Sequence, residues 1–115
     1  MATENLQIVR SSGPRNGTLI LQLKGSLNIH TVFDFQNALR SETAPAVILD
    51  FSGVPYIDSA GLGALVAAHV AAQRASRKVA YTGMNTQVMA LIEMTHVNQV
   101  FPTFASVQEA ELAIS

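Results

Sequence analysis

A run of six largely apolar residues near the middle of the chain leaves few folds open to it. Residues 46–51 read Ala-Val-Ile-Leu-Asp-Phe; they follow Pro45, and a loop begins at Ser52. A strand that is apolar at consecutive positions, and not only at alternate ones, is typical of a parallel sheet covered on both faces. The run therefore predicts a central strand with helices packed against it.

The segments around this run alternate between strand patterns and helix patterns. Residues 6–9 and 18–23 predict two strands, and the turn residues between them, including Asn16-Gly17, predict a hairpin. The other expected elements are strands over 78–81 and 100–101, and helices after Asn28, over 60–76, from about 88 to 98, and over 106–114. This order predicts one α/β domain over residues 1–115, with a mixed, mostly parallel sheet of about four or five strands and about four helices.

Helical periodicity predicts which side chains of the first helix face the core. Val32, Phe35 and Leu39 fall at i, i+3 and i+7, and Asn28 is expected to cap the helix. Phe33 lies off this stripe, so we expect its ring to be exposed.

Two later helices carry comparable signals. His69 is expected on the inner face of the second helix as a packed histidine with one satisfied nitrogen, and Ser106 with Glu109 matches a capping box at the last helix. The inner stripe predicted for the second helix consists of Leu62, Leu65, Val66, His69, Val70 and Gln73.

Composition excludes several classes of function. Seven Lys and Arg against eight Asp and Glu give a net charge of -1, so a nucleic-acid partner is not expected. The chain has no cysteine, which excludes disulfides, thiolate metal sites and cysteine nucleophiles. Only 13% of the residues are charged, which indicates that apolar surface is kept for a protein partner. No signal-peptide pattern and no apolar stretch of membrane-spanning length are present, so we expect a cytoplasmic protein without membrane contact.

Residues with catalytic or metal-binding chemistry do not form a recognisable set. His30, His69 and His96 lack the spacing of metal ligands, and no histidine lies in a motif that would meet Ser59. The Gly-Leu-Gly sequence at 61–63 lacks the third glycine and the lysine of phosphate-binding loops. We therefore expect no metal, no cofactor and no enzymatic activity.

One segment, Tyr-Ile-Asp-Ser-Ala-Gly-Leu-Gly at 56–63, places a hydroxyl at the expected start of a helix. Unpaired backbone N–H groups and the positive end of the helix dipole make such a position favourable for an anion. A phosphate on Ser59 would add about two negative charges there, beside Asp58. In a purely structural interpretation, Asp58 or Ser59 is only an N-cap and the glycines allow close packing. The residues alone leave both interpretations open.

The motif Asp-Ser-Ala-Gly-Leu-Gly at 58–63 resembles the signature of the STAS-domain anti-sigma factor antagonists. Residues 23–31 resemble that family's segment from strand end to first helix, and residues 88–101 resemble its third helix and the following turn. The resemblance covers residues 6–114 and implies a single STAS-like domain.

The resemblance also implies a regulator that acts by partner switching. Its unphosphorylated form would bind an anti-sigma factor, a serine kinase of the histidine-kinase-like ATPase fold, and thereby release that factor's target. Phosphorylation on Ser59 would block binding, and a PP2C-type phosphatase would restore it. The residues expected at the partner surface are Asn28, His30, Thr31, Phe33, Asp58, Ser59, Ala60, Gly61 and Leu62.

This chain departs from the family pattern at two positions. Members often carry an acid where Asn28 stands, and Ala60 leaves Ser59 as the only hydroxyl residue in the motif. One alternative function is a STAS scaffold subunit of a transporter or signalling complex, in which the serine is structural and never modified. The intact Asp58-Ser59 pair favours the phosphorylation switch. A small enzyme or nucleotide binder is disfavoured, because the chain has no acid–base pair and no phosphate-binding loop.

Overall fold

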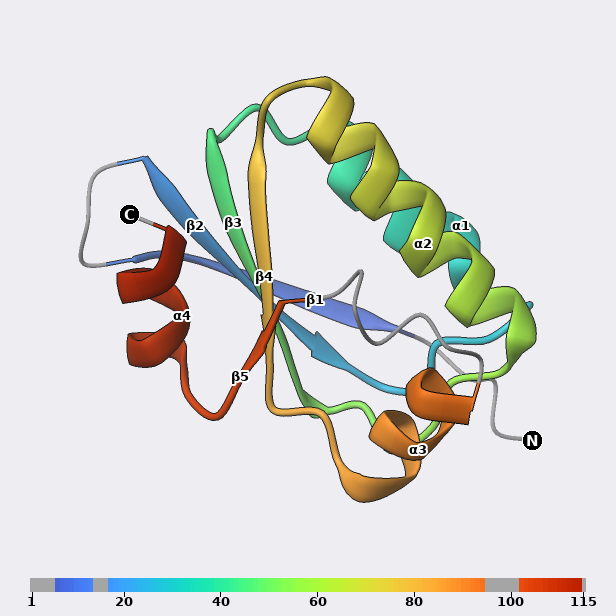
Figure 1. The fold of residues 1–115 in the computed structure, drawn as a ribbon. Coiled ribbons are helices and arrows are strands. Elements are labelled where there is room, and N and C mark those ends of the chain that lie inside the picture. Colours follow the sequence, from blue (N-terminus) through green and yellow to red (C-terminus); the bar gives the residue numbers. More distant parts are fainter. Residues whose placement is uncertain (1–5, 14–16, 95–101, 115) are drawn as a thin grey trace.

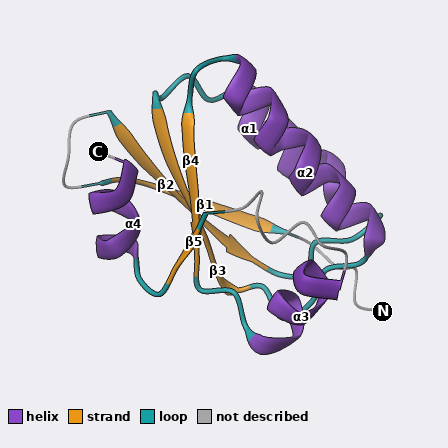
Figure 2. Ribbon diagram, viewed as in Figure 1, coloured by secondary structure: helices purple, strands orange, loops and turns teal. Residues whose placement is uncertain are grey.

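The computed structural model describes residues 6–13, 17–94 and 102–114, which form one five-stranded sheet with helices against both faces (Figure 1, Figure 2). The strands, in spatial order, are β1 (Gln7–Ser12), β2 (Thr18–Lys24), β3 (Ala46–Gly53), β4 (Lys78–Thr82) and β5 (Thr103–Phe104). β1 pairs with β2 in antiparallel orientation, and the remaining pairs are parallel. The predicted mixed sheet with an N-terminal hairpin is confirmed.

The helices of the described residues are α1 (Val32–Arg40), α2 (Ser59–Arg74), α3 (Thr86–Met94) and α4 (Val107–Ile114). In Figure 1, α1 and α2 lie side by side over one face of the sheet, and α4 lies on the other face. α3 shares the apolar core of α1 and α2, to which it contributes Val88 and Ile92.

β3 occupies the centre of the sheet, as its apolar run predicts. Val47, Leu49 and Phe51 are buried in the larger core with α1, α2 and α3. Ile48 is buried in the smaller core, which includes Ala110 of α4. Because each buried aliphatic or aromatic side chain contributes about 1.5–3 kcal/mol, this two-sided burial fixes the position of β3 and of the loop that follows it.

The parallel strands bring two loops to the same edge of the sheet. The chain runs from β2 into α1 and from β3 into α2, so both helices begin at this edge and end at the opposite one (Figure 1). An isolated parallel bridge between Leu27 and Ile57 joins the two loops there. The segment 56–63 lies at this edge.

The prediction that Asn28 caps α1 is wrong. The Asn28 Oδ1 atom accepts a hydrogen bond from the backbone N–H of His30 at 2.9 Å, and its backbone carbonyl accepts from Thr31 and Val32. An Asn side chain that bonds two residues ahead forms a turn of its own. This turn separates Asn28 from the helix, whose N-cap is Thr31; the Thr31 side chain makes no capping hydrogen bond to the first turn of the helix.

The predicted inner stripe of α2 holds only in part. Leu62, Leu65 and His69 are buried, but Val70 and Gln73 are exposed. Each helical residue is rotated about 100° from the one before it, so Ala72, three positions after His69, continues the buried face instead.

The capping box predicted at the start of α4 forms only in part. Ser106 Oγ accepts from the N–H of Glu109, as a capping box requires, but the Glu109 carboxylate accepts from Ala105 N and not from Ser106 N. The predicted strand at 100–101 and the predicted end of the third helix near residue 98 lie outside the described residues.

His69 is the packed histidine that its position predicts. Its side chain is buried, and its Nδ1 atom lies 2.9 Å from the hydroxyl of Tyr81 on β4. Burial lowers the pKa of His69 from its usual 6.5, since the charged ring loses solvation. The ring is therefore a neutral hydrogen-bonding group between α2 and the sheet.

Candidate functional site

Ser59 is the first residue of α2 and its side chain is exposed to solvent. Asp58 is the N-cap, in an extended backbone conformation, so the loop ends at Asp58 and the helix starts at Ser59, one residue before the predicted bound. Among the described residues no hydrogen bond involves the Ser59 hydroxyl, and the residue faces solvent.

The carboxylate of Asp58 joins two segments of backbone. Its Oδ1 atom accepts a hydrogen bond from Gly61 N at 2.8 Å, which satisfies one of the unpaired donors of the helix start. Its Oδ2 atom accepts from Ile29 N at 3.2 Å, in the loop between β2 and α1. Of the two structural assignments that the sequence left open, Asp58 is therefore the N-cap and Ser59 is not.

Backbone contacts hold the same two segments closely together. Leu27 N donates to Tyr56 O, and Asp58 N donates to Leu27 O, each at 3.1 Å. A Cβ atom on Gly61 would collide with the Leu27 carbonyl oxygen. Glycine at position 61 is therefore required by this close approach, whereas a Cβ atom on Gly63 would meet nothing within 4 Å.

The residues predicted for the partner surface fall into two groups, those that are at least partly exposed and those that are buried. His30, Phe33 and Ser59 are exposed, and Phe33 is 70% exposed, as predicted from its position off the apolar stripe. Asp58 and Ala60 are half-buried. The others are buried: Asn28, Thr31, Gly61 and Leu62.

Burial limits what the second group can do. Leu62, which was expected at the partner surface, instead packs in the larger core together with Ile57. Thr31 Oγ1 accepts from Asn28 N and donates to Ser26 O, so this side chain shapes the loop from within. These residues hold the exposed ones in place.

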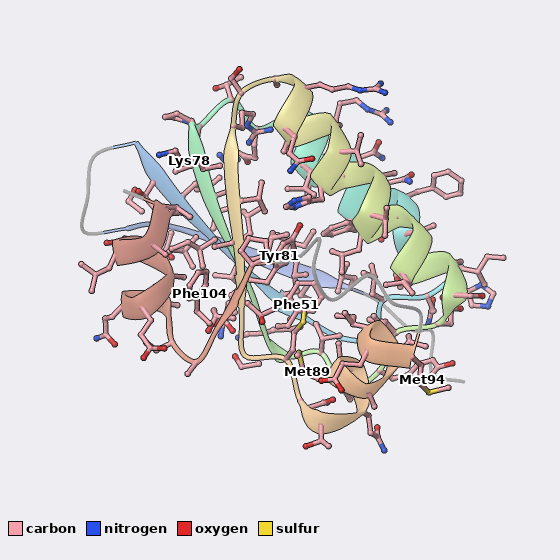
Figure 3. The ribbon with its side chains drawn as sticks, viewed as in Figure 1. Phe51, Lys78, Tyr81, Met89, Met94 and Phe104 are labelled. Atoms are coloured by element: carbon pink, nitrogen blue, oxygen red, sulfur yellow. The ribbon has the colours of Figure 1, made fainter. Side chains whose placement is uncertain are left out.

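Sequence reasoning missed three exposed apolar side chains at this end of the molecule. Ile29, Tyr56 and Met94 are 63%, 53% and 76% exposed. A groove of about 460 Å³ lies between the start of α2 and α3, and Tyr56, Ser59 and Met94 all line it. Figure 3 shows Met94 at the end of α3. Met94 follows Ile92 by two positions and so lies off the buried stripe of α3, the same signal that identified Phe33.

We call the exposed side chains of Ile29, Phe33, Tyr56, Ser59 and Met94 the docking face. Four of the five are large and apolar, and the fifth is a hydroxyl at a helix N-terminus. Exposed apolar side chains that gather in one place are typical of protein interfaces.

The described residues give no sign of a metal centre or a membrane span. No three His, Asp or Glu side chains among them are grouped as ligands would be. None of their helices is long and apolar enough to cross a bilayer.

The model of the STAS domain family matches residues 10–110. The chain belongs to the STAS domain family. An anti-sigma F factor antagonist from Paenibacillus polymyxa is 24% identical over 104 residues, which cover 87% of each chain.

Solved structures show the same STAS fold. An anti-sigma factor antagonist from Mycobacterium paratuberculosis matches with a TM-score of 0.82 at 18% identity, over 95% of this chain and 93% of that chain. A sulfate transporter family protein from Wolinella succinogenes matches with a TM-score of 0.77 at 17% identity, over 87% of this chain and 86% of that chain. At these identities the matches establish the fold and not the activity.

Proposed function

We propose that this STAS domain is a cytoplasmic anti-sigma factor antagonist that acts by binding and not by catalysis. Its unphosphorylated form binds an anti-sigma factor that is a serine kinase of the histidine-kinase-like ATPase fold. That kinase phosphorylates Ser59 and binding is lost, until a PP2C-type phosphatase removes the phosphate. The observation that carries the proposal is an exposed Ser59 at the start of α2, whose hydroxyl has no hydrogen-bond partner among the described residues and which lies within a face of exposed apolar side chains. The name of the Paenibacillus polymyxa relative supports it.

The position of Ser59 explains how a phosphate acts without refolding the domain. The first N–H groups and the dipole of a 16-residue helix favour a negative charge at its N-terminus. Asp58, and not Ser59, accepts the hydrogen bonds from Gly61 N and Ile29 N. A phosphate on Ser59 therefore displaces neither of these two bonds. The free protein therefore keeps its fold when modified.

The same phosphate acts differently when a partner covers the docking face. About two negative charges would then be desolvated beside the Asp58 carboxylate, which is costly unless cations of the partner meet them. A hundred-fold loss of affinity corresponds to about 2.8 kcal/mol, the size of one misplaced charge pair. Local charge is sufficient for the switch.

The test compares the affinities of wild type, Ser59→Ala and Ser59→Asp for the cognate kinase in the presence of ADP. Ser59→Asp should bind about 100-fold more weakly with an unchanged circular dichroism spectrum, and Ser59→Ala should bind like wild type. Ser12→Asp adds the same charge at an exposed serine of β1 and should leave affinity unchanged. Equal affinities for all four proteins would refute the proposal.

Mass spectrometry after incubation with the kinase and ATP gives a second measurement. Wild type should gain one phosphate, on Ser59, and Ser59→Ala should gain none. Phosphate on another residue, such as the exposed Ser52, would overturn the assignment of Ser59.

A second function remains open because the fold also matches the sulfate transporter family protein. In that case the domain would be a scaffold subunit of a transporter or signalling complex, and Ser59 would only begin a helix. A protein that neither binds the kinase nor accepts phosphate would support this alternative.

A further inference from the structure

A cavity of about 180 Å³ lies at the end of α1 and α2 that is remote from Ser59. Leu39 of α1 and Ala68 of α2 form part of its walls, and Leu49 and Val79 of the sheet form its floor. The small side chains of α2 leave this space, since alanine does not fill the distance between helix and sheet. The walls are thus apolar and come from four elements.

Two guanidinium groups border this cavity, those of Arg40 and Arg77. Arg77 Nε donates to the carbonyl of Ala44 at 2.9 Å, but its Nη2 atom is buried and finds no hydrogen-bond partner among the described residues. A buried donor without a partner destabilises the folded state, more so when the group is charged. The described residues therefore supply an acceptor for Arg77 Nε but none for Arg77 Nη2.

No acidic side chain borders the cavity to supply that acceptor. Among the described residues, an ion pair joins Arg10 and Glu42, and none involves Arg77. Arg74 and Lys78 lie close by in sequence, so four of the chain's seven Lys and Arg gather at this end. The end of the helix pair is therefore cationic outside and apolar inside.

We propose that this cavity binds a small carboxylate that carries an aromatic ring or a short alkyl chain. The apolar group occupies the space between α1, α2 and the sheet, and the carboxylate pairs with the guanidinium of Arg77, with Arg40 at the mouth. The size fits, because an apolar protein cavity of about 150 Å³ is large enough to hold benzene. Arginine suits the carboxylate, since its planar fork donates two parallel hydrogen bonds. The proposal does not depend on the function of Ser59.

The test is a titration of the ¹⁵N-labelled chain with sodium phenylacetate, followed by amide chemical shifts at constant ionic strength. Phenylacetamide, which has the same ring and no charge, is the matched ligand. Saturable shifts at residues around the cavity should occur with phenylacetate, and the amide should bind at least about ten-fold more weakly. Equal affinities would refute the role of the charge, and absence of saturable shifts with phenylacetate would refute the site.

Three variants locate the binding. Arg77→Gln removes the cation and should weaken phenylacetate at least about ten-fold, and Ala68→Leu fills the space and should abolish binding. Arg74→Gln removes a nearby charge that does not line the cavity and should bind like wild type. An equal loss in Arg74→Gln would show general charge attraction and overturn the proposal. If Arg77→Gln does not fold, Ala68→Leu and the amide comparison still decide.

Discussion

The two ends of the helix pair α1 and α2 are built in opposite ways. At the amino-terminal end, backbone hydrogen bonds and the Asp58 carboxylate pull two loops together, and the large apolar side chains point outward. At the carboxyl-terminal end, apolar side chains form most of the walls of a cavity, and Arg40 and Arg77 border it. The amino-terminal end is close-packed and exposes apolar side chains, whereas the carboxyl-terminal end is loosely packed and contains the cavity.

The difference between the two ends shows that close backbone packing and the burial of apolar side chains occur in different parts of this small domain. A face that binds a protein must keep its shape in water without burying its apolar side chains, so backbone contacts hold it instead. An internal ligand site needs the reverse, apolar walls with room between them. Substitutions at the two ends should therefore have unlike effects on stability.

The largest effect is expected for Gly61→Ala at the close-packed end. The added methyl group collides with the Leu27 carbonyl oxygen, which is backbone and cannot move aside, so the free energy of unfolding should fall by about 3 kcal/mol. Gly63→Ala is the matched control, and with open space around it should raise stability by about 0.5–1 kcal/mol. Urea denaturation measures both. Equal changes in the two variants would show that the loop at Leu27 does not approach the first turn of α2 as closely as described.

Removal of the Asp58 carboxylate comes next. Asp58→Ala leaves Gly61 N and Ile29 N without their acceptor and should lower the free energy of unfolding by about 2 kcal/mol. Ser59→Ala, one position later, removes a hydroxyl that forms no hydrogen bond with the described part of the chain and should change stability by less than about 0.5 kcal/mol. The same denaturation series tests both, and a larger loss for Ser59→Ala would contradict the assignment of Asp58 as N-cap.

Ala64 and Ala68 lie one turn apart on α2, so the same substitution at each position compares a filled part of the core with the cavity. Ala64 is buried in the larger core, so Ala64→Leu should cost about 1–2 kcal/mol through overpacking. Ala68 lines the cavity, and Ala68→Leu should be neutral or stabilise by up to about 1 kcal/mol. Thermal unfolding of both variants is the measurement. A cost for Ala68→Leu as large as for Ala64→Leu would mean that the space is not available.

The smallest effect is a pH dependence at His69, which lies between the two ends. Its pKa is lowered in the folded state, so the unfolded chain takes up a proton first as the pH falls below about 6.5. Stability from this group is thus complete above that pH and is lost as the pH falls through the lowered folded value. The slope is at most about 1.4 kcal/mol per pH unit.

The variants His69→Gln and His30→Gln separate this group from others. His69→Gln should flatten the decline in the urea midpoint between pH 7.5 and 5, whereas His30→Gln, at an exposed position, should leave it as in wild type. An unchanged decline in His69→Gln would remove His69 as its source.

Much of the fold was accessible from the sequence because its signals are local. The run at 46–51 predicts a strand buried on both faces, which the structure places at the centre of the sheet. The alternation of elements then gives the parallel order, and the start of α2 follows from Asp58-Ser59 before an apolar stripe. Phe33 could be placed outside by the period of its helix.

The remaining features depend on contacts between distant segments. The sequence could not show that Asn28 is not the cap of α1. Its side chain can accept from the backbone N–H two residues ahead or from an N–H of the first helical turn, and in the structure it accepts from His30 N. The bond from Ile29 N to Asp58 requires β2 and β3 to be neighbours, which no short pattern encodes. The cavity beside Arg77 results from small residues on one helix that meet two strands and a second helix, so periodicity alone does not reveal it.

The link between Ile29 and Asp58 has a consequence for recognition in the cell. It joins positions 29 residues apart, and it forms only after β3 has been placed beside β2. The docking face is therefore a conformational epitope, and a synthetic peptide that spans residues 56–63 carries the serine without the surface around it. Under the proposed function, a kinase that recognises this face would modify folded copies and not nascent or damaged ones, so phosphate on Ser59 would report how much intact protein is present.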